Sequence, residues 1–364
     1  MNELRQSYNR IVIKVGSSIL CQADKSNLCH FYNLAFQVAK AVVEQKKNII
    51  IVSSGAIALG SHALGIKGRP KEVSMLQASA AVGQKLLMDN YSLAFRQAVR
   101  QFGDYALHCG QILLTWDDFT HRKRYLNAKN TLLTLFKLGV IPIINENDTI
   151  ATEEIRFGDN DRLSALVATM VNAELLIILS DVEGLCDKQK KVIRVIADIT
   201  SQIRRLASPT DKVSCVGGMV TKIEAAKIAV ESGIPCVIAD GRQPQIINSL
   251  IDDPTSYGTL FVPKNSLTER QRWIAFGAKT KGSIVIDDGA VEAIKGKKSL
   301  LCVGVVAVKG NFEAGEIVSI EAKDGSEIAR GKAGISGRQL DKIKGSRFEK
   351  EIVHRDNIVV LNPR

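Results

Sequence analysis

The sequence has 364 residues, more than one hydrophobic core usually serves, so roughly two domains are expected. Apolar residues make up 45% of it, an ordinary share for a globular protein, and no apolar run approaches the roughly 20 residues that span a bilayer. The formal net charge of +11 at pH 7 favours anionic partners, either a nucleotide or a nucleic acid.

The start of the chain, MNELRQSYNRIVIKVG, lacks the charged-then-apolar layout of a signal peptide. A cytoplasmic protein with no membrane partner is therefore expected. The seven cysteines form no CxxC pair, so reduced and buried thiols are expected rather than a zinc site or a disulfide framework.

Compact apolar strings alternate with longer segments of helical period up to about residue 262. Residues 10–16 and 48–55 predict buried strands, and the three- and four-residue spacing of apolar positions at 75–103 predicts a long helix. Further strands are expected at 105–115, 139–146, 173–181 and 234–240. Apolar strands interleaved with helices predict an α/β fold, with an open, mostly parallel sheet sandwiched by helices.

The pattern changes after residue 262, where short β-like strings are separated by the turn-forming combinations DDG, KGN and KDG. This pattern of short strands and turns predicts a small β-rich C-terminal domain. The predicted boundaries are 1–262 for the first domain, 263–276 for a linker and 277–364 for the second domain.

Polar and small residues follow the predicted strands. In an open parallel sheet, ligands bind at the carboxyl ends of the strands, where loops meet helix N-termini. The residues at these ends are Lys14, Gly16, Ser17, Ser18, Ser53, Ser54, Gly55, Asp148, Ser180, Asp181, Asp240 and Gly241. Small residues let backbone N–H groups approach a phosphate, so the set favours a nucleotide site, although any one of these turns alone is more typical of a plain turn or cap.

Two lysines are candidates for phosphoryl transfer. Lys14 ends the first strand, and Lys222 lies in the first turns of a helix that follows the Gly-Gly turn at 217–218. If both face one crevice, their ammonium groups would stabilise a transferring phosphoryl group. The sequence contains no P-loop, dinucleotide or protein kinase motif, and its five histidines are scattered, which disfavours a histidine-based nucleophile system.

Two Asn/Asp-rich clusters, at 145–148 and 159–161, lie close to predicted strands. In isolation, each is well explained as a turn or a helix cap. A substrate-binding role is favoured only if both clusters lie at the sheet edge that carries the other polar residues.

Segments KVGSS, VSSGAIALG, INEND, GDND, LLIILSDVEGL and GGMVTK resemble, in this order, segments of the glutamate 5-kinase family of amino-acid kinases. The likeness spans nearly all of residues 10–262, and GSIVIDDGAVEAI with GVVAVKGNFEAGEIVSI resembles a PUA domain. The resemblance implies ATP-dependent phosphorylation of the side-chain carboxylate of L-glutamate to L-glutamyl 5-phosphate, the first step of proline biosynthesis. A carboxylate with a pKa of about 4.3 is already an anionic nucleophile at neutral pH, so no general base is needed.

The resemblance also implies site residues. Lys14 would contact the ATP phosphates, Lys222 would stabilise the transferring group, and Asp161 would orient both lysines. The expected glutamate ligands are Ser54, Asp148 and Asn160, with Asp148 as the counter-charge of the α-ammonium group. The expected ATP-binding residues are Lys14, Gly16, Ser180, Asp181, Val216, Gly217, Gly218, Met219, Val220, Thr221 and Lys222. Mg²⁺ is expected to bridge phosphate oxygens, with few protein ligands.

The implied partners are L-glutamate, ATP, proline as feedback inhibitor, and further copies of the chain in a dimer or tetramer. Acetylglutamate kinases and aspartokinases share the sheet and the phosphate loops, but the two Asn/Asp clusters and the β-rich tail disfavour them. RNA binding by the PUA-like domain is the alternative from another class, and no clear aromatic stacking platform supports it. Two departures from the family pattern are a short, basic loop after Leu185 and Val216 in place of a common threonine.

Overall fold

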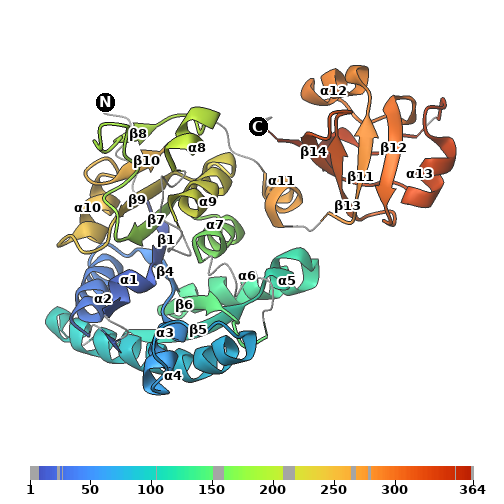
Figure 1. The fold of residues 1–364 in the computed structure, drawn as a ribbon. Helices are drawn as coiled ribbons and strands as arrows, with labels where there is room; N and C mark the ends of the chain where they lie inside the picture. Colours follow the sequence, from blue (N-terminus) through green and yellow to red (C-terminus); the bar gives the residue numbers. More distant parts are fainter. Residues whose placement is uncertain are drawn as a thin grey trace. The chain divides into compact units, whose positions relative to one another are not determined.

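The computed structural model describes residues 8–22, 25–26, 28–103, 105–150, 160–207, 218–263, 268–277, 280–348 and 350–361. The chain divides into two compact units. One unit comprises Met1–Asp118 and Arg122–Ser266, and the other comprises Phe119–His121 and Leu267–Arg364. Figure 1 labels the elements of both units.

The first unit is built on an eight-stranded sheet in the order β5-β6-β4-β1-β7-β9-β10-β8. Its strands are β1 (Arg10–Val15), β4 (Asn48–Ser53), β5 (His108–Leu114), β6 (Val140–Glu146), β7 (Leu175–Ser180), β8 (Val195–Ile196), β9 (Cys236–Asp240) and β10 (Thr259–Phe261). Neighbouring strands are parallel except for β9 and β10. The predicted open, mostly parallel sheet is confirmed.

Helices cover both faces of this sheet. Figure 1 shows α2 (Leu28–Val43) and α4 (Val73–Val99) on one side, and α7 (Asn160–Met170) and α9 (Met219–Glu231) on the other. Because both faces are covered, the central strands have no water-facing side and are apolar throughout, as in β7, where all six residues are buried. The remaining helices of this part of the chain are α1 (Ser17–Leu20), α3 (Ala56–Ala63), α5 (Trp116–Thr120), α6 (Arg122–Lys137), α8 (Ser201–Ala207) and α10 (Ile246–Asp252). Two short strands, β2 (Cys21–Gln22) and β3 (Lys25–Ser26), form a separate antiparallel pair.

Helices α3 and α4 pack with their backbones in contact. A Cβ atom on Gly60 would lie 1.7 Å from the carbonyl oxygen of Ser79, and one on Gly83 would lie 1.8 Å from that of Ala56. Only glycine fits at either position, since no real side chain tolerates such distances. Ala56 begins α3 just after the end of β4, so this contact holds α4 against the loop that carries Ser54.

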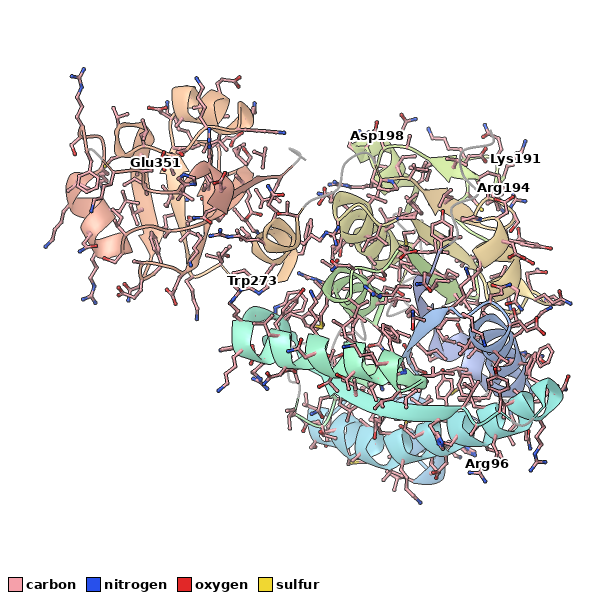
Figure 2. The ribbon with its side chains drawn as sticks, turned by 180° about the vertical axis from the view of Figure 1, so that it is seen from behind. Arg96, Lys191, Arg194, Asp198, Trp273 and Glu351 are labelled. Atoms are coloured by element: carbon pink, nitrogen blue, oxygen red, sulfur yellow. The ribbon has the colours of Figure 1, made fainter. Side chains whose placement is uncertain are left out.

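The loop after β7, short and basic in sequence, forms a hairpin. Cys186 pairs with Val192 in an antiparallel bridge, and Oδ1 of Asp187 accepts the backbone N–H of Lys191 at 2.9 Å. Figure 2 shows Lys191 and Arg194 at the outer edge of the first unit. The aspartate-centred turn explains how so few residues reverse the chain here.

The second unit contains a five-stranded sheet in the order β12-β11-β13-β14-β15. Its elements are α11 (Glu269–Arg272), β11 (Gly282–Ile286), α12 (Asp288–Lys295), β12 (Val305–Gly310), β13 (Ile317–Glu321), β14 (Glu327–Lys332), α13 (Gly337–Ile343) and β15 (Ile358–Val360). Residues including Ile284, Phe312 and Ile320 form its core. The predicted small, β-rich C-terminal domain is confirmed.

Part of the predicted linker packs on this second sheet. Ile274 and Ala275 are buried against Ile317 and Val359, and Nη1 of Arg330 donates to the carbonyl oxygen of Ala275 at 2.8 Å. In the described part of the chain, no helix is both long and apolar enough to cross a membrane, and no cysteine is in a disulfide.

Candidate active site

The carboxyl ends of β6, β4, β1, β7 and β9 lie side by side, because these strands are adjacent and parallel. Most of the predicted site residues lie at this edge or at the N-termini of α7 and α9. Two of the predicted ATP-binding residues, Val216 and Gly217, lie outside the described residues, as does Asp159 of the second Asn/Asp cluster.

One carboxylate pairs with both predicted lysines. Oδ1 of Asp161, in the first turn of α7, lies 2.5 Å from Nζ of Lys14, and its Oδ2 lies 3.3 Å from Nζ of Lys222. Thr221 adds a hydroxyl that donates to Oδ2 of Asp161 at 2.8 Å. The side chains of Lys14, Lys222 and Asp161 are 8%, 6% and 1% exposed, so the three charges interact away from bulk water.

The environment keeps Asp161 ionised. Burial opposes ionisation, but the charges of Lys14 and Lys222 and the hydrogen bonds from Lys14 and Thr221 together hold the pKa of Asp161 below its usual value. Two ammonium groups and one carboxylate leave an excess of one positive charge at this point of the sheet edge. Such an excess suits an incoming phosphate chain.

Asn160 precedes Asp161 and gathers residues from two strand ends. Its Nδ2 lies 2.9 Å from Oγ of Ser54, 3.0 Å from the carbonyl oxygen of Ser53 and 2.9 Å from Oδ1 of Asn145. The structure thus joins the predicted pair Ser54 and Asn160. It also adds Asn145, which the sequence placed in the first cluster without assigning it a role.

Asp148 follows β6 and is partly buried. Burial raises its pKa to about 6, and the nearby charge of Arg69 lowers it by a smaller amount. Arg69 lies in the loop after α3, and no local sequence signal links it to Asp148. A carboxyl group with this pKa carries its negative charge at neutral pH and loses it in mild acid.

Ser180 and Asp181 lie at the end of β7, and Oγ of Ser180 donates to Oδ1 of Asp181 at 3.1 Å. Beside them, Arg242 donates from Nε and Nη2 to the two carboxylate oxygens of Asp240, both at 2.8 Å, and from Nη2 to the carbonyl oxygen of Asp181 at 2.9 Å. These hydrogen bonds from Arg242 lower the pKa of Asp240. Arg242, which follows the DG turn after β9, was not among the predicted site residues.

Gly16 uses its backbone N–H within the sheet, donating to the carbonyl oxygen of Leu179 at 3.1 Å. A Cβ atom at this position would lie 3.8 Å from Nζ of Lys14. This distance is an ordinary van der Waals contact, so the space beside the lysine does not require glycine, and the N–H group of Gly16 is already occupied.

Two cavities in the described part of the chain are lined by residues other than Lys14, Asp161 and Lys222. A cavity of about 670 Å³ lies in the second unit and is lined by residues that include Lys297, Lys298, His354 and Arg355. A cavity of about 230 Å³ in the first unit lies beside Ile19, Leu179 and Gly241. Of the predicted strand-end residues, Gly241 lines the second cavity. We identify the site by the converging charges and hydrogen bonds around Asp161.

Comparison with known proteins shows the family of the chain. Residues 9–240 match the amino acid kinase family and residues 282–354 match the PUA domain. The chain therefore belongs to the amino acid kinase family. It is 42% identical over 377 residues to the glutamate 5-kinase of Syntrophotalea carbinolica, covering 98% of this chain and 99% of that protein. It is also 42% identical over 372 residues to the glutamate 5-kinase of Caldanaerobacter subterraneus subsp. tengcongensis, covering 97% and 98%. Within the family, the chain groups with the glutamate 5-kinases, as the sequence motifs predicted.

Among solved structures, the carbamate kinase from Giardia lamblia bound to AMP-PNP is 19% identical, with a TM-score of 0.48 over 71% of this chain and 99% of that chain.

Proposed function

We propose that this chain transfers the γ-phosphoryl group of ATP to the side-chain carboxylate of L-glutamate, with Lys14, Asp161 and Lys222 as the transfer centre. The observation that carries the proposal is the pairing of two buried lysines with one buried carboxylate at the carboxyl edge of a parallel sheet. The relationship to glutamate 5-kinases over nearly the full length supplies the substrate.

In the proposed reaction, an oxygen of the glutamate side-chain carboxylate attacks the γ-phosphorus of ATP. A new O–P bond forms while the bond from the γ-phosphorus to the bridging oxygen of ADP breaks, and both electrons of that bond leave with ADP. Lys14 and Lys222 stabilise the charge that shifts onto the transferring group and the leaving oxygen. Asp161 holds the two ammonium groups in place, so the enzyme acts by positioning and electrostatics without a general base.

Glutamate is assigned to Ser54, Asp148 and Asn160. Asn160 contacts Ser54 directly, and Asp148 provides a negative charge for the α-ammonium group of glutamate. ATP is assigned to residues at three strand or helix ends and, by resemblance, to two residues before α9. They are Lys14 and Gly16 at the end of β1, Ser180 and Asp181 at the end of β7, Gly218, Met219, Val220, Thr221 and Lys222 at the start of α9, and Val216 and Gly217 by resemblance.

Mg²⁺ enters the proposal with ATP. Across the described residues, no group of three His, Cys, Asp or Glu side chains could hold a metal ion, and Asp161 is already paired with two lysines. The proposed ion is bound chiefly by phosphate oxygens and water and neutralises phosphate charge.

Further parts of the proposal rest on the family resemblance: proline as feedback inhibitor, a dimer or tetramer, and a cytoplasmic location. The domain boundaries of 1–262, 263–276 and 277–364 also remain our prediction, which the division of the chain near Ser266 supports. The proposed function does not include RNA binding by the second unit. The residues that line the cavity of the second unit include no Phe, Tyr or Trp on which bases would stack.

The proposed activity is tested by measuring ADP release with ATP, Mg²⁺ and one amino acid at a time. We expect turnover with L-glutamate, little with L-aspartate or N-acetyl-L-glutamate, and loss of turnover when EDTA removes the metal. Addition of proline should inhibit the reaction. A preference for N-acetyl-L-glutamate would contradict the substrate assignment.

Acid should weaken glutamate binding through Asp148. Because burial raises the pKa of Asp148 to about 6, the carboxyl group becomes protonated as the pH falls through that value and its attraction for the α-ammonium group is lost. At pH 5 about one molecule in ten retains the charge, so the KM for glutamate should be about tenfold higher than at pH 8. Glutamate itself, with a side-chain pKa of about 4.3, stays mostly ionised in this range.

The matched control is Asp148→Asn. This variant should have a raised KM for glutamate that no longer rises in acid, while the KM for ATP changes less than about twofold. A collapse of ATP affinity in Asp148→Asn, or an unchanged pH profile, would show that Asp148 does not face the glutamate ammonium group.

A further inference from the structure

Three amide side chains from distant parts of the sequence form a buried chain of hydrogen bonds at the proposed glutamate site. Nδ2 of Asn160 in α7 donates to Oδ1 of Asn145 in β6 at 2.9 Å. Nδ2 of Asn145 in turn donates to Oε1 of Gln84 in α4 at 2.8 Å. The three residues are 7%, 2% and 9% exposed, so water competes little for these bonds.

Two backbone groups determine which way each amide faces. The carbonyl oxygen of Ser53 can only accept a hydrogen bond, so the atom of Asn160 that lies 3.0 Å from it must be the nitrogen. The N–H of Glu146 can only donate, so the atom of Asn145 that lies 2.9 Å from it must be the oxygen. The nitrogen of Asn145 therefore faces Gln84 as a donor, so the atom of Gln84 that accepts this hydrogen bond must be its oxygen.

This arrangement leaves Oδ1 of Asn160 as a buried acceptor without a hydrogen-bond partner among the described residues. Burying an acceptor without a hydrogen bond is destabilising, so an unfilled acceptor indicates a ligand that donates. The α-ammonium group of glutamate has three donors and no acceptor, and it fits this oxygen. If the Asn160 amide were reversed, its NH₂ group would face the ammonium group, donor against donor.

The position of Gln84 is fixed by contacts of α4 on either side of it. Its neighbour Gly83 is in backbone contact with Ala56 at the start of α3, as described above. About two turns further along α4, the hydroxyl of Tyr91 lies 2.9 Å from Oγ of Ser53. Helix α4 thus contacts the polar groups behind the site at two points, through Gln84 and through Tyr91.

We propose that Gln84 is a positioning residue for glutamate. Through Asn145, it holds the Asn160 amide with its carbonyl oxygen turned toward the ammonium group of the substrate. The inference rests on the proposed role of Asn160 as a glutamate ligand. It adds a residue of α4 that neither the sequence motifs nor the ion pairs of the transfer centre indicate.

The test uses Gln84→Met, which keeps the length of the side chain and removes the acceptor for Asn145. The control is Gln97→Met, the same change at an exposed position of the same helix. We expect the KM for glutamate to rise about tenfold in Gln84→Met, as loss of a well-formed hydrogen bond predicts, with the KM for ATP within about twofold of the parent. Gln97→Met should match the parent in both.

The specific measurement compares glutamate with glutarate, which lacks the α-ammonium group, as a competitive inhibitor. The ratio of the glutarate inhibition constant to the glutamate KM should fall about tenfold in Gln84→Met, because only the ligand with the ammonium group loses its partner. Gln84→Glu keeps an oxygen acceptor for Asn145 and should restore both the KM and the ratio to within about threefold of the parent.

Several outcomes would overturn the inference. Equal weakening of glutamate and glutarate would indicate a general structural effect, and an equally impaired Gln84→Glu would place the role in the NH₂ group of Gln84 itself. If Gln84→Met does not fold, Gln84→Ala is measured against Gln97→Ala with the same criteria. A normal Gln84→Met beside an impaired Asp148→Asn would refute the inference alone, whereas normal behaviour of both would refute the glutamate assignment.

Discussion

Replacing Lys222 with alanine should lower kcat about 10²- to 10³-fold, the loss expected when one group that stabilises transition-state charge is removed. The ammonium group of Lys222 is buried, lies 3.3 Å from Asp161 and belongs to the turn that we assign to ATP. Its positive charge acts on the transferring group more than on bound ATP, so the KM values should change far less than kcat. Initial rates of ADP release at saturating glutamate and ATP measure the effect.

The fold of Lys222→Ala should persist, because Asp161 keeps its ion pair with Lys14. Thermal unfolding of the variant therefore serves as an internal check. Lys227→Ala is the matched control: Lys227 lies on the same helix, pairs with Glu231 at 3.5 Å and has no assigned role. Near-normal turnover in Lys222→Ala would remove Lys222 from the proposed mechanism.

The second large effect is expected for Asp161→Asn, which preserves size and removes the charge. Lys14 and Lys222 would then face each other in a buried site with no carboxylate between them. Removing one partner of a buried ion pair costs about 3–5 kcal/mol, so the free energy of unfolding should fall by about that amount at pH 7. Turnover should fall at least 100-fold as well, since both ammonium groups lose their fixed positions.

The pH dependence of stability distinguishes this electrostatic effect from a packing defect. The pKa of Asp161 is lowered in the folded protein, so the ionised group contributes stability above its unfolded pKa of about 3.9 and loses that contribution as the pH falls through the folded pKa. The stability difference between the parent and Asp161→Asn should therefore be full near pH 7 and narrow below about pH 4. Urea unfolding at a series of pH values measures it.

The control for Asp161→Asn is Asp198→Asn, the same change at an exposed aspartate that Figure 2 shows at the outer surface of the first unit. Exposed substitutions of this kind usually change stability by less than about 0.5 kcal/mol. If Asp161→Asn were as stable and as active as Asp198→Asn, the ion pairs would not be the centre of the site.

Much of the site could be predicted because a parallel sheet gathers strand ends that are far apart in the sequence. The apolar strings around Lys14, Ser54 and Ser180 indicate strands that helices connect, and consecutive parallel strands must end at the same edge. The position of Lys222 after a Gly-Gly turn likewise places it at a helix start that points to this edge. These signals are local in the chain, so residue patterns are sufficient to read them.

The tertiary structure alone decided which side chains meet. Gln84 lies 61 residues before Asn145 in the sequence. The spacing of apolar residues in α4 indicates that Gln84 is on a buried face, but it does not indicate that the Asn145 amide lies within hydrogen-bond distance. The contacts of Arg69 with Asp148 and of Arg242 with the carbonyl oxygen of Asp181 likewise join separate loops. Sequence periodicity encodes the face on which a side chain lies, whereas the partner of that side chain depends on the path of the whole chain. For this reason the residues at the strand ends could be predicted, and the hydrogen bonds from Gln84 through Asn145 to Asn160 could not.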